Sequence, residues 1–122
     1  MPRFVVLEHA PGAAANRGLH WDLMLETGTH LRTWALDTLP AAGEIVSAVP
    51  LADHRLLYLD YEGPLSDDRG TVTRWDEGTY ELVRQSEREL LLNFAGRRLI
   101  GSAELSCLPD EPQRWRFIWS GS

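Results

Sequence analysis

Leu19-His20-Trp21-Asp22-Leu23-Met24-Leu25-Glu26 is the stretch from which the fold of this chain can be worked out. Successive side chains of a β-strand point to opposite faces, so one face here is apolar and the other carries His20 and Asp22. An imidazole and a carboxylate placed in this way can bind one small cation, with a third ligand from elsewhere. His9 and His54 are the candidates. An isolated His-x-Asp is more often the polar face of a half-buried strand, so the neighbouring segments must decide.

The segments on either side of this stretch also have the pattern of strands. Residues 3–8 form an apolar run that ends at His9, just before a Pro-Gly breaker, so we expect a strand that carries His9 at its end. Residues 30–36 alternate and follow the turn signal Thr27-Gly28-Thr29, which predicts a hairpin with the strand that contains His20. Three candidate ligands thus lie on neighbouring strands or at their ends.

The middle of the chain is also predicted to be made of strands. Residues 45–49 form a short run that Pro50 ends, which predicts an edge strand. Residues 53–63 predict a strand on which His54 and Tyr58 share a face and can approach one ligand together.

The second half of the chain repeats this alternating pattern. Residues 71–75 and 80–84 predict a hairpin that turns at Asp76-Glu77-Gly78. Further strands are expected in residues 87–94, 99–105 and 115–119. About eight to ten short strands without a convincing amphipathic helix are typical of an all-β fold, and we predict a small closed or nearly closed β-barrel. Inward-pointing residues would form a polar cavity at the mouth of such a barrel.

Length and composition fit one soluble domain. The chain has 122 residues, of which 43% are hydrophobic, so residues 1–122 are expected to form a single domain. The lone Cys107 has no cysteine partner, which favours a reducing compartment. No apolar run approaches the ~20 residues of a membrane span. We expect a cytoplasmic monomer.

The charge of the chain limits how it can bind nucleic acid. The formal net charge is −6, which argues against nonspecific binding through a broad basic surface. A local basic pocket stays possible. All 12 basic residues are Arg, whose forked guanidinium groups suit phosphate.

The ordered series of motifs resembles the 3'-phosphoesterase domain of bacterial DNA ligase D. The similarity extends over nearly the whole chain in the same order and includes the His-x-Asp and His-x-x-x-Tyr spacings. The segments that carry it are residues 4–9, 19–26, 31–36, 53–63, 70–80 and 96–101.

The resemblance implies a small β-barrel that binds a divalent metal, usually manganese, and trims 3'-phosphate or 3'-ribonucleotide ends of a DNA primer strand. It assigns the metal ligands to His9, His20 and Asp22, and the phosphate-facing pair to His54 and Tyr58. The substrate would be a DNA or RNA/DNA 3' end, and a separate DNA ligase or polymerase would be a possible partner. These donors also suit zinc and iron, so the choice of metal stays open.

The chain departs from the family pattern in its phosphate-binding groups. Met24 stands where the family has an Arg two residues after the metal-binding Asp, and a thioether cannot neutralise a phosphate. Leu7, Thr38 and Glu44 stand where the family tends to carry Gln, Lys and a basic residue. Candidates that could replace the lost groups are Arg32, Arg55, Arg74 and Arg17.

Three hypotheses about function follow. The first is a metal-dependent phosphoesterase acting on nucleic-acid 3' ends in DNA repair. The second is a non-catalytic metal-binding module that recognises nucleic-acid ends or a partner protein, which Met24 motivates. The third is a non-haem iron oxygenase, because two His and one carboxylate form the facial triad of that class. The spacing from Asp22 to His54 is short for its distal ligand.

Overall fold

The described part of the chain folds into nine β-strands and one short 3-10 helix. The computed structural model describes residues 1–15 and 17–121. In chain order the elements are β1 (Arg3–Ala10), β2 (His20–Thr27), β3 (His30–Leu36), β4 (Ile45–Arg55), η1 (Leu56–Leu59), β5 (Gly63–Pro64), β6 (Thr71–Gln85), β7 (Glu89–Gly96), β8 (Ile100–Leu108) and β9 (Glu111–Trp119).

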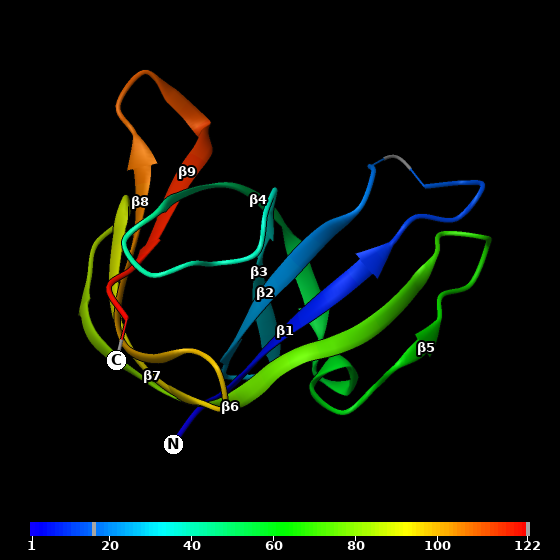
Figure 1. Ribbon diagram of the computed structural model, residues 1–122, viewed down its shortest axis with the longest axis horizontal. Helices are drawn as coiled ribbons and strands as arrows, with labels where there is room; N and C mark the ends of the chain where they lie inside the picture. Colours follow the sequence, from blue (N-terminus) through cyan, green and yellow to red (C-terminus); the bar gives the residue numbers. More distant parts are fainter. Residues whose placement is uncertain (16, 122) are drawn as a thin grey trace.

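Eight of the strands close into an antiparallel barrel (Figure 1). Their order is β1-β2-β3-β4-β9-β8-β7-β6, and β6 returns to pair with β1. The ninth strand, β5, pairs only with the beginning of β6. Closure leaves these eight strands without a free edge on which another chain could add a strand. The predicted all-β barrel is therefore confirmed.

Alternate residues of β1, β2 and β3 belong to two different apolar clusters. The larger cluster receives side chains from all eight barrel strands, Phe4, Leu23 and Trp34 among them, and so fills the lumen of the barrel. The smaller cluster includes Leu7 and Met24, and it lies on the opposite face of the same strands. Leu59 of η1 belongs to this smaller cluster, and Leu56 and Tyr58 of η1 pack against it, so the 3-10 helix covers the outer face of the barrel at this point.

Three details of the predicted strands are wrong. β4 continues through Pro50 to Arg55 and pairs with both β3 and β9, so it is not an edge strand. η1 interrupts the strand expected over residues 53–63. β6 runs unbroken for 15 residues through the supposed turn at residues 76–78.

The buried carboxylate of Asp76 explains why β6 continues there. It accepts hydrogen bonds from the backbone N–H groups of Glu77, Arg97, Arg98 and Leu99. Its side chain thus caps the turn between β7 and β8 and does not form a turn of its own.

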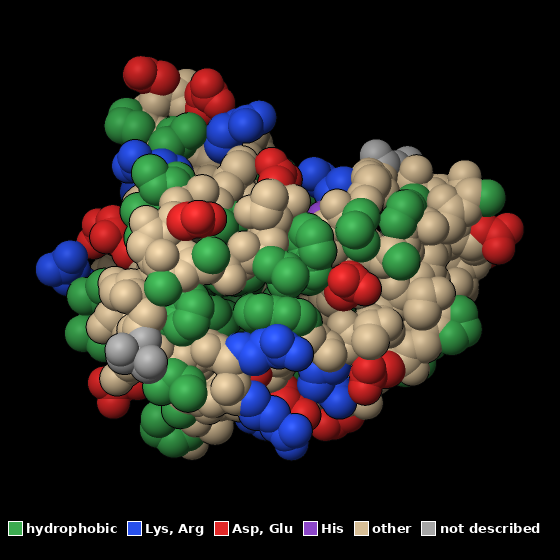
Figure 2. Space-filling model, viewed as in Figure 1, with side chains coloured by type: hydrophobic (Ala, Val, Ile, Leu, Met, Phe, Trp, Pro, Cys, Tyr) green, Lys and Arg blue, Asp and Glu red, His purple; other side chains and the backbone are tan. Residues whose placement is uncertain are grey.

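The surface carries charges of both signs. On the face shown in Figure 2, arginine and acidic side chains are interspersed and no single-sign patch dominates. Within residues 1–15 and 17–121, no helix is long and apolar enough to cross a membrane.

Candidate metal centre

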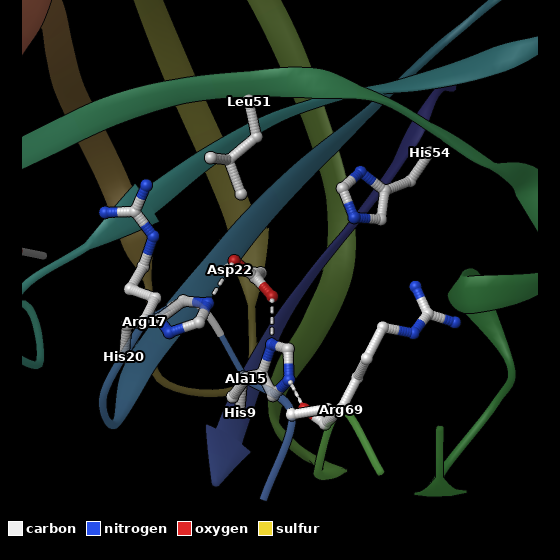
Figure 3. Close-up of a pocket in the computed structure, with 9 residues that line it drawn as sticks. His9, Ala15, Arg17, His20, Asp22, Leu51, His54 and Arg69 are labelled. Carbon is white, nitrogen blue, oxygen red and sulfur yellow. Dashed lines mark hydrogen bonds and ion pairs between the residues drawn. The ribbon is translucent and has the colours of Figure 1, made fainter. Parts of the chain in front are cut away.

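Three polar side chains converge at one end of the β1–β2 pair. His9 lies directly opposite His20 in the antiparallel register, and Asp22 follows two residues along β2 on the same face. His9 Nδ1 is 3.3 Å from Asp22 Oδ2, and His20 Nε2 is 3.0 Å from Asp22 Oδ1 (Figure 3). One ligand atom from each residue lies within 4.8 Å of the other two.

Backbone carbonyls fix both imidazole rings. His20 Nδ1 donates to the Gly18 carbonyl at 2.8 Å, and His9 Nε2 donates to the Arg69 carbonyl at 2.9 Å. A carbonyl oxygen only accepts hydrogen bonds, so these contacts place the ring proton on the nitrogen that points away from Asp22. In the neutral rings, the nitrogens that face Asp22 therefore present lone pairs. Metal-binding histidines are commonly oriented in this way.

Two imidazole lone pairs that face a carboxylate form an arrangement that favours a cation between them. Asp22 is 2% exposed, and its Oδ1 has no hydrogen-bond partner although His20 Nε2 is 3.0 Å away, because that nitrogen presents a lone pair in the neutral ring. A buried polar atom without a partner is costly, and a metal ion bound between the three side chains would satisfy it. The two imidazoles and the carboxylate are donors that manganese, iron and zinc all accept. The residues fit a divalent cation.

Burial and the contacts between the imidazoles and the Asp22 carboxylate shift the pKa values of His9 and Asp22. The hydrogen bond with Asp22 raises the pKa of His9 above its ordinary value, against the opposing effect of burial. Burial by itself would raise the pKa of Asp22, but the two neighbouring imidazoles outweigh burial and hold that pKa below its ordinary value. Both shifts therefore arise from the contact between the imidazoles and the Asp22 carboxylate.

The cluster lies on the outer face of the barrel, not at its mouth as the sequence suggested. His9, Asp22 and Met24 alternate with lumen residues along β1 and β2, and Met24 belongs to the smaller cluster under η1. The lumen is filled by apolar side chains from all eight strands, which leaves the outward face for the site.

His54 and Tyr58 are both close to the cluster. A cavity of about 180 Å³ is lined by His9, His20, Asp22 and His54. A neighbouring cavity of about 100 Å³ is lined by Tyr58 together with His9, Asp22 and His54. The His54 and Tyr58 rings meet edge to face with centroids 5.7 Å apart, although Tyr58 lies on η1 and not on the predicted strand.

His54 is not one of the converging ligands. Among the described residues, the group with metal-binding spacing consists of His9, His20 and Asp22. His54 Nδ1 donates to the Ala52 carbonyl at 2.9 Å, which leaves its Nε2 available to a ligand in the cavity.

The structure brings only some of the candidate arginines to this cavity. Arg17 lines it, whereas Arg55 lines an adjoining cavity. Arg32 lies on the lumen side, 4.8 Å from the centroid of the Trp34 ring. Arg74 forms ion pairs with two glutamates in a separate cavity.

Arg69 is an additional arginine that sequence reasoning did not single out. It lines the 180 Å³ cavity beside His9, His20 and Asp22, and in Figure 3 it lies on the opposite side of Asp22 from Arg17. Its position in a polar loop gave no periodic signal. The only hint was its place next to Gly70, just before a predicted strand.

The profile of the DNA ligase D 3'-phosphoesterase domain matches residues 12–106 of the 122-residue chain. The chain belongs to this family. The matched segment of the phosphoesterase domain contains His20, Asp22, His54 and Tyr58, while His9 precedes it. No curated protein matches the chain.

Met24, where the resemblance led us to expect an Arg, is a buried residue of this member of the 3'-phosphoesterase family. It is 1% exposed, packs with Val5, Leu7 and Leu59, and also contributes to the wall of the cavity that contains Asp22 and Tyr58. The position expected to carry an Arg is therefore part of an apolar floor beside the metal cluster.

Proposed function

We propose that this protein is a metal-dependent phosphoesterase that removes a 3'-phosphate or a 3'-ribonucleotide from nucleic-acid 3' ends in DNA repair. The observation that carries the proposal is the convergence of two carbonyl-anchored imidazoles on the buried Asp22 carboxylate in a member of the 3'-phosphoesterase family. Membership of the family gives the reaction class, and the convergence gives a reason why this chain can perform it.

His9, His20 and Asp22 would hold the metal. A divalent ion bound there supplies Lewis-acid polarisation of a phosphoryl oxygen and lowers the pKa of a bound water. We propose manganese as the native ion, and zinc and iron are the alternatives that these donors accept. The carbonyls of Gly18 and Arg69 would keep the ligand nitrogens unprotonated and correctly turned.

We propose that His54 and Tyr58 bind and orient the phosphate and supply a proton. The free Nε2 of His54 faces the cavity, and the Tyr58 hydroxyl forms no hydrogen bond with the described part of the chain. The Tyr58 hydroxyl can donate to a phosphate oxygen or supply the proton that the 3' oxygen takes up when its bond to phosphorus breaks. His54 can do the same from Nε2 when its ring carries a second proton, because Nδ1 already donates to the Ala52 carbonyl. The acidic protein would bind this anion locally, with Arg17 and Arg69 on the rim of the cavity.

A 3'-phosphorylated primer gives the direct test. We expect the purified protein with Mn²⁺ to release inorganic phosphate from this primer, and to remove a 3'-terminal ribonucleotide from a second primer. His20→Ala should abolish both activities, while His30→Ala, which changes an exposed imidazole 3.3 Å from Asp53, should preserve them. Wild-type protein that binds Mn²⁺ but releases no product from either primer would overturn the proposal.

The buried Met24 favours a second candidate, a non-catalytic module that retains the metal and recognises nucleic-acid ends or a partner protein. Without the guanidinium expected at this position, binding could persist while turnover is lost. This candidate predicts stoichiometric, metal-dependent binding of the 3'-phosphorylated primer with no product. Slow phosphate release that His20→Ala removes would exclude it.

A further inference from the structure

A further cavity, called the second cavity below, lies on the side of η1 next to the cavities that His9 and Asp22 line. Its volume is about 290 Å³, and Arg55, Tyr61 and Arg69 contribute to its walls. Tyr58, Leu65 and Arg69 line both this cavity and the smaller one that contains His9 and Asp22. The two spaces therefore share one wall, and a ligand that fills the second cavity lies next to the metal cluster.

The second cavity is suited to an anion. No acidic side chain lines it, and neither Arg55 nor Arg69 forms an ion pair within residues 1–15 and 17–121. By contrast, Arg3 and Arg74 each have a carboxylate within 3.2 Å. Two guanidinium groups without ion pairs thus give this cavity a local positive charge in a chain whose net charge is −6.

The Arg69 side chain is held in place before any ligand binds. Asp67 and Asp68 both have positive φ, 61° and 53°, in the left-handed region that Asp tolerates in turns. Across this turn, Arg69 Nε donates to the Ser66 carbonyl at 2.9 Å and its Nη2 donates to Ser66 Oγ at 3.0 Å. The guanidinium keeps further N–H groups free, and its fixed position lowers the entropic cost of binding.

Close packing between backbones fixes the loop that carries this turn. Gly70, at φ 115°, lies so near to β1 that a Cβ there would be 2.0 Å from the Ala10 carbonyl oxygen. On the facing loop, a Cβ at Gly12 would be 2.2 Å from the Asp68 carbonyl oxygen, and Ala14 N–H donates to the same oxygen at 2.9 Å. Arg69 is therefore tied to the strand that carries His9.

Aromatic surface completes the cavity. The Tyr58 and Tyr61 rings meet edge to face with centroids 6.0 Å apart, and the Tyr61 hydroxyl donates to the Pro64 carbonyl. Leu57, which also lines the cavity, is 45% exposed. Arginines combined with aromatic rings are the usual composition of grooves that bind single-stranded nucleic acid, where the rings stack on bases.

We infer that this cavity is a second subsite, which binds the nucleotide that precedes the 3' end of a single strand. Arg55 and Arg69 hold the phosphodiester, and Tyr61 contacts the base. The inference rests on the proposed function, since it assumes that the 3' end itself occupies the metal cavity. The rest of the strand then leaves the metal cluster past Arg69 and over η1.

Binding of short oligonucleotides tests the subsite without requiring turnover. Calorimetric titrations in EDTA compare thymidine 3'-phosphate with a thymidine tetranucleotide that carries the same 3'-phosphate. We expect wild-type protein to bind the tetranucleotide on the order of tenfold more tightly, because only the longer ligand reaches the second cavity. Arg55→Ala should remove most of this advantage and leave the affinity for the mononucleotide within about twofold. Arg55 is exposed, so this variant should fold.

Two further variants complete the design. Arg116→Ala removes an arginine on β9, outside the lining of both cavities, and should change neither affinity. Tyr61→Leu should weaken tetranucleotide binding several-fold, whereas Tyr61→Phe, which keeps the ring, should preserve it.

The outcomes separate this inference from the proposed function. Equal affinities of wild-type protein for the two ligands, or an equal loss for both in Arg55→Ala, would overturn the subsite. Arg55-dependent binding of a hexaglutamate peptide, with no length dependence for the nucleotides, would make the cavity a protein-docking site and would also overturn it. A preserved length dependence together with no phosphate release in Mn²⁺ would sustain the subsite and reject the hydrolytic activity.

Discussion

His9 and His20 face each other directly across β1 and β2, with ring centroids 4.6 Å apart and planes inclined by 50°. This inclination keeps the rings from stacking flat, and each ring turns one nitrogen toward Asp22. The two imidazoles come from strands that residues 11–19 connect, yet the hydrogen-bonded register of the strands sets their spacing. The site is thus as well defined as the pairing of β1 with β2.

Removal of either imidazole should abolish tight metal binding. Loss of a partner that only orients a ligand commonly costs 10–100-fold in affinity, so His9→Ala and His20→Ala should each weaken Mn²⁺ binding by at least about 100-fold in calorimetric titration. His30→Ala, on the exposed end of β3, is the matched control and should bind as wild type does. Wild-type affinity in His9→Ala would remove His9, which lies outside the family match, from the ligand set.

The pH dependence of the metal-free protein should follow the His9–Asp22 contact. Its hydrogen bond raises the pKa of His9 above 6.5, so the stabilisation from protonated His9 is full below pH 6.5 and is lost as the pH rises through the raised value. The pKa of Asp22 is lowered from 3.8, so its contribution is present above pH 3.8 and is lost as the pH falls through the lowered value. NMR titration of the imidazole C–H signals and urea denaturation at several pH values measure both effects. Asp22→Asn should return the pKa of His9 toward 6.5, and a His9 pKa that does not respond would contradict the assignment.

Asp76 should be among the most important polar residues for stability. Its carboxylate is 2% exposed and accepts four backbone hydrogen bonds at 2.8–3.2 Å, three of them from the turn between β7 and β8. Asp76→Ala leaves these N–H groups without partners, and we expect a loss on the order of 3 kcal/mol or more in the free energy of unfolding. Urea denaturation measures it. Glu104→Ala, which removes an exposed carboxylate on β8, should change stability by less than about 0.5 kcal/mol.

Met24 should act through packing and not through contact with the phosphate. Met24→Leu conserves volume and should cost less than about 1.5 kcal/mol, whereas Met24→Ala opens a cavity in the cluster under η1 and should cost about 2–5 kcal/mol. Thermal unfolding gives both values. In the 3'-phosphate assay, Met24→Leu should retain the wild-type kcat. A large loss of kcat in this variant would show that the thioether has a role in the reaction.

Alternation along the strands was enough to predict much of the fold and part of the His9–His20–Asp22 group. The parity of residues 19–26 placed His20 beside Asp22, and the apolar run that precedes His9 gave the neighbouring strand. Parity alone could not decide between His9 and His54, because that choice depends on which strands pair and in what register. Resemblance to the family assigned the role to His9, and the spacing of the described ligand atoms agrees with it.

The errors came from residues whose partners are distant in the sequence. Asp76-Glu77-Gly78 has the composition of a turn, but its carboxylate caps a turn some 20 residues further on, as the Arg97 contact shows. Arg74 is engaged by Glu62, a contact that local patterns do not reveal. Arg32 shares a strand face with Trp34, but only the closure of the barrel shows that this face is the lumen. Arg69 was overlooked because a turn with positive φ angles, and no periodic element, directs it to the cavity.

The alternation of lumen and metal-site residues along β1 and β2 separates the folding of this protein from its chemistry. Val6 and Leu23 belong to the barrel interior, while Leu7 and Asp22, the residues next to them in sequence, belong to the outer face. Polar groups on the outer face can therefore be exchanged without changing the side chains that fill the lumen. The same independence makes the barrel a practical scaffold for engineering new metal sites on its outside.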